Sequence, residues 1–351
     1  MKILHISSEN IANVPITLVH AHRRLGHYAR LITFFKNSYG FEEDIVLNLP
    51  FSKLKTFSGI KKLFKIGTYN SVGKTELKYF NPKLIERVFF NIRDEFWKRK
   101  ISRFSNFINS FDIYIYYGGL DFLRNCEIIR ELKKKGKKIG IIYLGSDLRL
   151  RGIIRCVEEC ADRIFTVEFD HTFFHPRVEY IFLPIDVWSL RTKEFRKKEY
   201  ITICHAPTNR FLKGTDYLID AYNELKDRYP VKLLILENMN HNDVLKIKYE
   251  ECDILVDQLT DFGGFGYGMN SLESLGMGIP TITYLNEDYE KFIPDHPFIN
   301  ASYKNIKEKL EELLRDEKLR KNKGFYGRLW VEKYHDAQVV GRYIIDRINE
   351  D

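Results

Sequence analysis

Short apolar, β-branched runs alternate with segments of helical period along almost the whole chain, a pattern typical of buried strands between helices. The first half predicts strands at 2–7, 28–34, 112–117, 138–144, 163–167 and 179–183, with helices at 16–25 and 82–110. The second half predicts strands at 200–204, 231–236, 253–256 and 281–284, with helices at 215–229, 242–249 and 269–275, and three more helices across 303–351.

This alternation favours a parallel sheet with helices on both faces, and it occurs twice. A chain of 351 residues is long enough for two domains with separate cores. The polar stretch WSLRTKEFRKK lacks an apolar period and suggests a linker. We therefore expect an α/β fold of two Rossmann-like domains, 1–187 and 200–351, which face across a cleft, with a linker at 188–199 and terminal helices in the second domain.

The net charge of +8 is not spread evenly. Residues 51–104 contain 14 Lys/Arg and 4 Asp/Glu, a net charge of +10, so the remaining residues carry −2. One localised anionic partner is therefore expected, and no nucleic-acid-binding module is recognisable. In one interpretation 51–104 is a solvated helical insertion whose aromatic residues pack on the first domain. In the other it is a patch facing an anionic membrane, made by Phe51, Phe64, Phe89, Phe90 and Trp97 among Lys61, Lys62, Lys65, Lys98, Arg99 and Lys100.

The termini and cysteines exclude several classes of protein. No signal sequence is recognisable, and no stretch approaches the roughly 20 apolar residues that span a bilayer, so a cytoplasmic protein with at most peripheral membrane contact is expected. Five scattered cysteines do not resemble a disulfide framework and are expected to be structural thiols. Cys156 and Cys160 stand at i and i+4, but no second pair at ligand spacing accompanies them, and no metal site is expected.

Segment 257–280, DQLTDFGGFGYGMNSLESLGMGIP, joins a glycine-rich loop to the start of a helix. The glycines let the backbone approach a ligand closely, and the unpaired N–H groups of a helix start favour phosphate. Glu273, one turn later, can accept hydrogen bonds from the two hydroxyls of a ribose. The plainer alternative is a glycine-rich connection with a solvated glutamate. The predicted donor-binding residues are Gly266, Gly268, Met269, Asn270, Ser271 and Glu273.

A second segment, HAPTNRFLKG at 205–214, follows the first strand of the second domain. It places Arg210 and Lys213 at the carboxyl end of that strand. The developing charge of a diphosphate leaving group needs neutralisation, which a guanidinium and an ammonium can supply. The plainer alternative is that Arg210 and Lys213 are two basic residues of the surface. This alternative is less favoured because segments 205–214 and 257–280 are both expected at the same end of one sheet.

Together these segments resemble the retaining GT-B glycosyltransferases, specifically the group-1, family-4 sugar-nucleotide transferases. That family has an Arg and a Lys-Gly before a helix, as Arg210 and Lys213-Gly214 stand here. It also has a Glu-x7-Glu signature whose second Glu lies in Leu-Glu-Ala-Met-Ala-x-Gly-x-Pro, and residues 272–280 read LESLGMGIP. The resemblance implies that Glu273 binds the ribose and that Arg210 and Lys213 bind the donor diphosphate.

Two positions depart from the family pattern. The first Glu of the signature, which contacts the donor sugar in the family, is Phe265 here. In the first domain, LGSD at 144–147 with Arg149 resembles a His-Gly-Ser-Asp run that faces the acceptor, but its His is Leu144. Asp147 is then the expected acceptor-side catalytic carboxylate.

The resemblance implies a hexosyltransferase-type reaction, from a nucleotide-sugar donor to a glycan or lipid-linked acceptor, with retention of configuration and without metal or other cofactor. Arg210 and Lys213 would stabilise the leaving diphosphate. Two alternatives stay open. A non-catalytic nucleotide-sugar-binding protein is favoured by Phe265 and Leu144. A sugar-nucleotide epimerase needs acid and base carboxylates that the sequence does not place.

Overall fold

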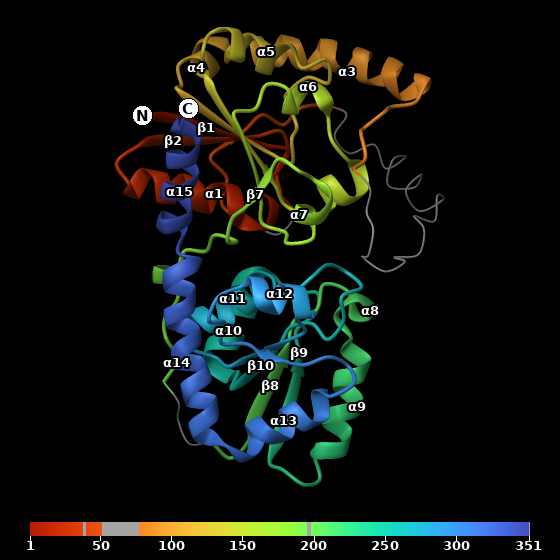
Figure 1. Ribbon diagram of the computed structural model, residues 1–351, viewed down its shortest axis with the longest axis vertical. Helices are drawn as coiled ribbons and strands as arrows, with labels where there is room; N and C mark the ends of the chain where they lie inside the picture. The colour runs from red at the N-terminus through yellow and green to blue at the C-terminus, as the bar shows by residue number, and fades with distance from the viewer. Residues whose placement is uncertain (38–39, 51–76, 195–197, 351) are drawn as a thin grey trace. The chain divides into compact units, whose positions relative to one another are not determined.

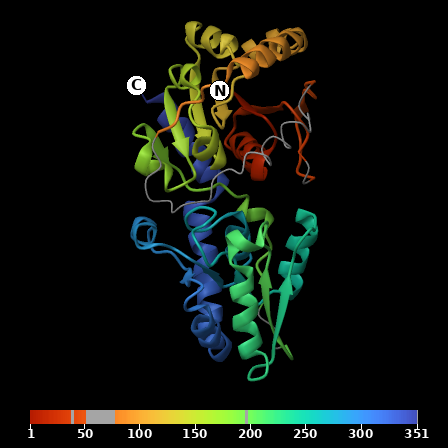
Figure 2. The same ribbon diagram turned by 90° about the vertical axis from the view of Figure 1, so that its right-hand side faces the viewer.

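The computed structural model describes residues 1–37, 40–50, 77–194 and 198–350. They form two compact units (Figures 1 and 2). Unit 1 comprises Met1–Phe182 and Val340–Asp351, and unit 2 comprises Leu183–Val339. Each unit contains one parallel sheet with flanking helices, which confirms the predicted α/β class.

The sheet of unit 1 has seven strands in the order β3-β2-β1-β4-β5-β6-β7. The strands are β1 (Lys2–Ser7), β2 (Tyr28–Thr33), β3 (Ile45–Val46), β4 (Ile113–Tyr117), β5 (Lys138–Tyr143), β6 (Arg163–Thr166) and β7 (Val178–Tyr180). The helices are α1 (Val14–Arg24), α3 (Leu84–Ser102), α4 (Ser105–Asn109), α5 (Glu127–Lys134), α6 (Arg155–Glu158), α7 (His171–Phe174) and most of α15 (Ala337–Asn349).

The strands of unit 1 bury side chains on both faces, because helices cover both. One face, with Leu4, Tyr114 and Ile141, packs against Trp97 and Ile101 of α3 and Ile129 of α5. On the other face Gly140 of β5 leaves room for α15, where Ile348 is completely buried. The β-branched runs were therefore readable as strands because both of their faces are apolar.

The return of α15 to unit 1 differs from the sequence-based boundaries, which assign 200–351 to the second domain. A hydrogen-bond chain fastens the helix: the Gly341 carbonyl accepts from His22 Nε2 at 3.1 Å, and His22 Nδ1 accepts from His5 Nε2 at 3.0 Å. The Arg347 guanidinium also donates to Glu179 at 2.8 Å. The contacts of Gly341 and Arg347 join residues more than 150 positions apart, so no local pattern predicts them.

The sheet of unit 2 has five strands in the order β12-β11-β10-β8-β9. The strands are β8 (Ile201–His205), β9 (Val231–Ile235), β10 (Ile254–Val256), β11 (Thr281–Thr283) and β12 (Ile299–Asn300). The helices are α8 (Arg210–Lys213), α9 (Thr215–Leu225), α10 (His241–Glu251), α11 (Met269–Gly276), α12 (Glu287–Phe292), α13 (Ile306–Arg315) and α14 (Glu317–Tyr334). The two-residue strands β3 and β12 were not predicted, since they are too short to carry a pattern.

Alternate residues of the unit 2 strands point to opposite faces. Ile203 and Ile254 pack with α9 and α13, whereas Cys204 and Leu255 pack with residues around α10 and α11. The predicted linker belongs partly to this unit, because the Lys193 N–H donates to the Met277 carbonyl at 2.7 Å and Leu190 packs in the second cluster. Residues 195–197 of that linker lie outside the described residues.

The prediction that all the cysteines are thiols is wrong for two of them. Cys126 and Cys156 form a disulfide with a Cα–Cα distance of 6.2 Å. Cys160, Cys204 and Cys252 are buried free thiols. Cys126 precedes α5 and Cys156 lies in α6, so the pairing depends on how these segments pack and not on sequence spacing.

The basic segment 51–104 is described only from residue 77 onward, where α3 lies within the helix expected at 82–110. Phe51, Phe64, Lys61, Lys62 and Lys65 of the expected membrane patch lie outside the described residues. Trp97 is only 4% exposed, and its Nε1 donates to the Pro50 carbonyl at 2.8 Å, so it belongs to the core of unit 1. Across the described ranges, no helix combines the length and the apolar character needed to cross a membrane.

We expect Gly140→Ala to destabilise the protein by about 1–2 kcal/mol, because a Cβ at Gly140 would lie 2.6 Å from Ile348 Cδ1. Ile348→Val removes that atom. The double variant should therefore lose less stability than the sum of the two single variants. Urea unfolding of the four proteins measures this coupling, and strict additivity would contradict the packing of α15 on β5.

Candidate functional site

The predicted donor residues of unit 2 lie at the point where its strand order reverses. β8 and β10 are neighbours in the sheet, and their following connections run to opposite sides. In open α/β sheets such a reversal leaves space for a ligand beside the carboxyl ends of the strands. The loops after β8 and β10 are joined by backbone contact, since the Leu259 N–H donates to the Lys213 carbonyl at 3.1 Å.

Asp257, directly after β10, is the centre of this arrangement and is 1% exposed. Its Oδ1 accepts from Lys213 Nζ at 2.8 Å, and its Oδ2 accepts from the Ser271 hydroxyl at 2.6 Å. The Gly268 N–H also points to Oδ2, at 3.4 Å. One buried carboxylate thus connects α8, the glycine-rich loop and the first turn of α11.

The electrostatics of Asp257 are dominated by two opposing effects. Burial raises the pKa of its carboxyl, but the Lys213 ammonium and the Ser271 hydroxyl lower it more, to about 2. Lys213 Nζ also donates to Gln258 Oε1 at 3.0 Å. Both charged groups are therefore held in one geometry. The Lys213 side chain as a whole remains 20% exposed.

Arg210 occupies the other end of the short helix α8, which Asn209 caps by accepting from the Leu212 N–H at 3.0 Å. The Arg210 guanidinium donates to Glu237 through Nε at 2.9 Å and Nη2 at 2.6 Å. Its side chain is 51% exposed, so solvent screens this ion pair and leaves it weak. Arg210 and Lys213 are thus close in sequence but have different carboxylate partners.

The glycine-rich loop needs glycine at position 266. Gly266 has a φ of +75°, a conformation that other residues rarely adopt. A Cβ there would also lie 1.8 Å from Cε1 of Tyr289, whose ring stacks on that of Tyr267 in the same loop. Gly268 is the N-cap of α11 and has no side chain to cap the helix, which leaves its first N–H groups open at this end.

Four further predicted residues belong to α11. Met269 lies at its first position, half-buried. Ser271 is completely buried, and its hydroxyl donates to Asp257, so its side chain helps to hold the loop. Asn270 accepts through Oδ1 from Lys248 Nζ at 2.9 Å. That Ser271 contacts the donor stays a prediction, and its buried side chain leaves its backbone N–H, in the first turn of α11, as the group that would do so.

Glu273 is 5% exposed, and both of its carboxylate oxygens are paired. His241 Nε2 donates to Oε1 at 2.6 Å, and Lys248 Nζ donates to Oε2 at 2.6 Å. Burial raises the pKa of Glu273, but Lys248 and His241 lower it by more. Lys248 is completely buried, so its ammonium fixes both the charge and the orientation of the carboxylate.

Asp147 belongs to unit 1, among different neighbours. Its carboxylate accepts from three backbone N–H groups, those of Leu144, Gly145 and Leu148, at 2.8–2.9 Å. These three hydrogen bonds hold the carboxylate in one orientation within its loop. Arg149 is also engaged, because it pairs with the carboxylates of Glu168 and Asp170. The catalytic role of Asp147 stays a prediction.

Sequence reasoning missed Asp257, His241 and Lys248 as site residues. The signal for Asp257 was present, since it is a carboxylate directly after a buried strand of the second domain. His241 and Lys248 gave none, because α10 carries several polar residues and only the packing selects the two that contact Glu273. His205 joins the strands: its Nδ1 donates to the Val256 carbonyl and its Nε2 accepts from Thr215, both at 2.8 Å.

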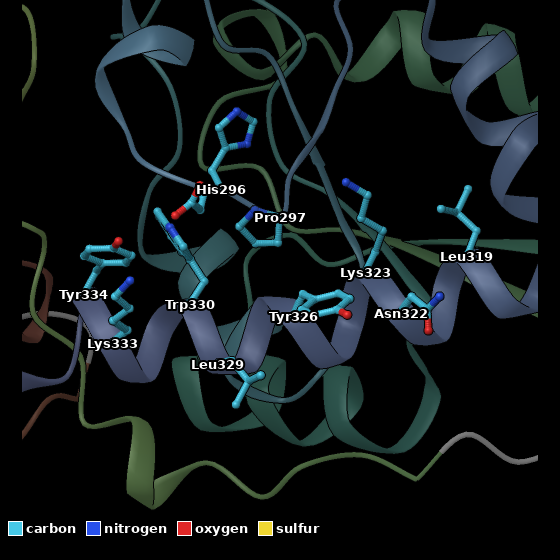
Figure 3. A pocket seen from close by; sticks show the side chains of 11 residues that line it. His296, Pro297, Leu319, Asn322, Lys323, Tyr326, Leu329, Trp330, Lys333 and Tyr334 are labelled. Atoms are coloured by element: carbon cyan, nitrogen blue, oxygen red, sulfur yellow. The ribbon is translucent and has the colours of Figure 1, made fainter.

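Unit 2 also contains a pocket of about 460 Å³ that does not include these residues (Figure 3). It lies between α14 and the segment at 295–297, with Trp330 on the helix side. The ring centroids of Trp330 and Tyr267 lie 5.6 Å apart. The Trp330 ring therefore lies between the pocket and Tyr267 of the glycine-rich loop. In the described parts of both units, no group of three His, Cys, Asp or Glu side chains could hold a metal ion.

The lowered pKa of Asp257 makes a testable contribution to stability. The pKa of the Asp257 carboxyl is about 2 in the folded protein and about 3.9 in the unfolded chain. Its contribution to stability is therefore fully present above pH ~5 and is lost as pH falls. It amounts to about 2 kcal/mol, and about half is lost by pH 3. We expect Asp257→Asn to have a lower free energy of unfolding than the unsubstituted protein at pH 5. The difference between the two proteins should become smaller as the pH falls from 5 to 3, as measured by urea unfolding. The exposed Asp227→Asn serves as control, and a gap independent of pH would contradict the assignment.

No protein-family model matches the sequence, and no curated protein sequence matches it. Solved structures do resemble it over their full length. Sucrose-phosphate synthase from Thermosynechococcus elongatus superposes with a TM-score of 0.61 at 11% identity, covering 99% of this chain and 98% of that one. An α-glucosyltransferase, in complex with UDP-glucose and DNA containing an abasic site, gives 0.60 at 12% identity, covering 100% and 99%.

HepE of Anabaena, in complex with UDP and glucose, gives a TM-score of 0.55 at 10% identity, covering 99% of this chain and 98% of that one. At such low identity the likeness concerns the fold. The two units of this chain, with their parallel sheets and flanking helices, have the two-domain α/β architecture of the GT-B glycosyltransferases.

Proposed function

We propose that this protein is a glycosyltransferase that moves a sugar from a nucleotide-diphosphate donor to a glycan or lipid-linked acceptor, with retention of configuration and without a metal ion. The observation that carries the proposal is the meeting of Lys213 with the uncapped start of α11 at the strand-order reversal of unit 2. An ammonium and open N–H groups at one place suit a diphosphate. The fold shared with nucleotide-sugar transferases supports it.

The proposed reaction needs no nucleophile from the protein. The bond between the anomeric carbon and the diphosphate breaks, the acceptor hydroxyl attacks from the same face, and the leaving phosphate takes the hydroxyl proton. The work of the protein is to stabilise the charge on the departing diphosphate. Lys213 is held in place for this by Asp257, and Arg210 is an exposed guanidinium on the same short helix.

Glu273 is proposed to bind the ribose, with help from two residues of α10. Lys248 keeps the carboxylate ionised and fixed, and each carboxylate oxygen keeps one lone pair for a hydroxyl. His241 is 29% exposed beside Oε1, where a ribose hydroxyl would approach. We therefore place His241 in the donor site, as a neighbour of the ribose.

The alternative of a non-catalytic nucleotide-sugar-binding protein shares this donor site and differs only in releasing no diphosphate. Phe265 in place of the family glutamate favours it. The epimerase alternative is weaker, because the two carboxylates at the donor site, Asp257 and Glu273, are each paired with a buried or half-buried lysine.

The experiment combines donor binding with turnover. UDP, GDP and their sugars are screened for a rise in the melting temperature of the protein. Release of the nucleoside diphosphate is then measured with the sugar donor that raises it most. We expect Arg210→Gln to lower release by about 100-fold with little change in unfolding free energy. Arg228→Gln is a matched control, since Arg228 is 50% exposed and pairs with Glu311 as Arg210 pairs with Glu237.

Equal turnover in both arginine variants would contradict the proposed role of Arg210. Donor binding without release in the unsubstituted protein would favour the non-catalytic alternative. Absence of binding by every nucleotide tested would contradict the proposed function itself.

A lipid-linked acceptor would place the protein at a membrane surface, and α3 supports this part of the proposal. The apolar side chains Leu84, Ile85, Val88, Ile92 and Phe96 are 47–84% exposed along this helix. Residues 83–103 carry seven Lys/Arg and three Asp/Glu, a net charge of +4. An apolar stripe among cations complements an anionic bilayer, whereas two copies of the helix would repel each other.

We expect binding to vesicles with about 30% anionic lipid, and weaker binding at high salt. Replacing Ile85, Val88 and Ile92 together by Ser should weaken binding at least about tenfold without loss of stability. The control replaces Phe325, Tyr326 and Leu329 of α14 by Ser, since these residues are 45–60% exposed. Equal loss in both triple variants, or a dimer without lipid that the α3 variant abolishes, would contradict the membrane assignment.

A further inference from the structure

Unit 1 contains a second pocket, of about 290 Å³, beside the first turns of α3. Its floor and walls are mostly apolar, and three arginines lie among them. The lining residues are Phe80, Pro82, Phe90, Arg124, Arg130, Ile154, Arg155, Cys156 and Glu159. None of them belongs to the donor residues described above.

Arg124 is the deepest of the three cations. Its guanidinium lies 5.1 Å from the ring centroids of both Phe80 and Phe90. Its Nη1 is buried and has no hydrogen-bond partner among the residues that the structure describes. A buried donor without an acceptor is costly, and more so when it is charged.

The carboxylate of Asp94, which acts electrostatically on Arg124, is already committed to other donors. Asp94 accepts through Oδ1 from the Arg93 guanidinium and through Oδ2 from the backbone N–H of Arg124, at 2.6 Å. Burial lowers the pKa of Arg124 to about 9, and the nearby cations Arg93 and Arg151 contribute to this more than Asp94 offsets it. The site thus holds an excess of positive charge.

The other two arginines are exposed residues of the pocket rim. Arg130 donates to the Asn125 carbonyl at 3.3 Å, and Arg155 lies over the ring of Tyr79 at 4.8 Å. Neither forms an ion pair with a carboxylate in the described part of unit 1. Glu159 is the only acidic residue in the lining, against three guanidinium groups.

We propose that this pocket is an anion site that takes a phosphate group, with Arg124 as the buried contact and Arg130 and Arg155 as the contacts at the rim. A phosphate oxygen would accept from the Arg124 guanidinium, and its charge would neutralise the excess. Guanidinium groups suit phosphate because their planar N–H donors match its oxygens. The apolar walls leave room for a hydrocarbon part of the same ligand.

The phosphate can come from solution or from a lipid headgroup, and the chemistry of recognition is the same. The inference does not depend on the proposed sugar transfer, because its residues lie in unit 1 and its test contains no nucleotide. A protein that does not bind phosphate could still bind and cleave a nucleotide-sugar donor. A protein without donor activity could likewise still bind phosphate in this pocket.

The test measures thermal unfolding of the full chain with sodium phosphate against sodium chloride of equal ionic strength, and binding by calorimetry. A second arm uses dihexanoylphosphatidic acid below its micelle concentration. We expect phosphate to raise the melting temperature, and Arg155→Gln or Arg130→Gln to weaken binding about tenfold. Arg342→Gln, an exposed arginine of α15, is the matched control.

Arg124→Met separates this proposal from a structural role. It removes an unneutralised buried cation while keeping the apolar volume, so the phosphate-free protein should melt at a higher temperature and lose its response to phosphate. Tighter binding of the short-chain lipid would identify a headgroup as the source, and equal binding would identify free phosphate. An Arg124→Met variant that melts lower and still responds to phosphate would overturn the inference, as would an unsubstituted protein that responds to neither ligand.

Discussion

The contact between Asp257 and Lys213 is the constraint on which the donor end of unit 2 depends. A carboxylate that is 1% exposed must be paired, and its partners come from two other segments of the chain. It therefore fixes the ammonium of α8 against the start of α11. The glycine-rich loop between them is held at both ends, by Asp257 on one side and by the packing of Gly266 on Tyr289 on the other.

The buried charges of this protein fall into two groups with different meanings. Lys248 and Glu273, like Lys213 and Asp257, are neutralised within unit 2, and such pairs hold a carboxylate or an ammonium in a fixed position. Arg124 in unit 1 has a buried donor without a partner among the residues that the structure describes. A compensated pair is complete in the folded chain, whereas an uncompensated cation indicates a partner from outside it. The same reasoning distinguishes the core-facing side of α3, with Trp97, from the side on which Ile85 and Val88 are exposed.

The fold was predictable because every strand longer than two residues carries its own signal. Runs such as those of β1, β5 and β10 are apolar on both faces, and glycine marks many of their ends. The two-residue strands, the return of α15 and the Cys126–Cys156 disulfide were not predictable, since each depends on contacts between distant segments.

The candidate site was predictable only where function leaves a local motif. Lys213, Glu273 and Gly266 stand in such motifs, and the structure brings Lys213 and the start of α11 together through Asp257. The partners of Glu273 could not be read in this way, because a helix such as α10 presents many polar side chains and packing decides which of them reach the carboxylate. The same limit applies to Ser271, because only packing decides that its hydroxyl donates to Asp257.

The return of α15 also affects the order in which the units can fold during synthesis. Residues 340–350 complete the core of unit 1, yet the ribosome makes them after the whole of unit 2. Until then the sheet face around Gly140 and His22 lacks its covering helix and exposes apolar surface. Unit 2 can close as soon as α14 emerges, so the first unit in sequence is the last to be finished, and its nascent form is the one that a chaperone would need to protect.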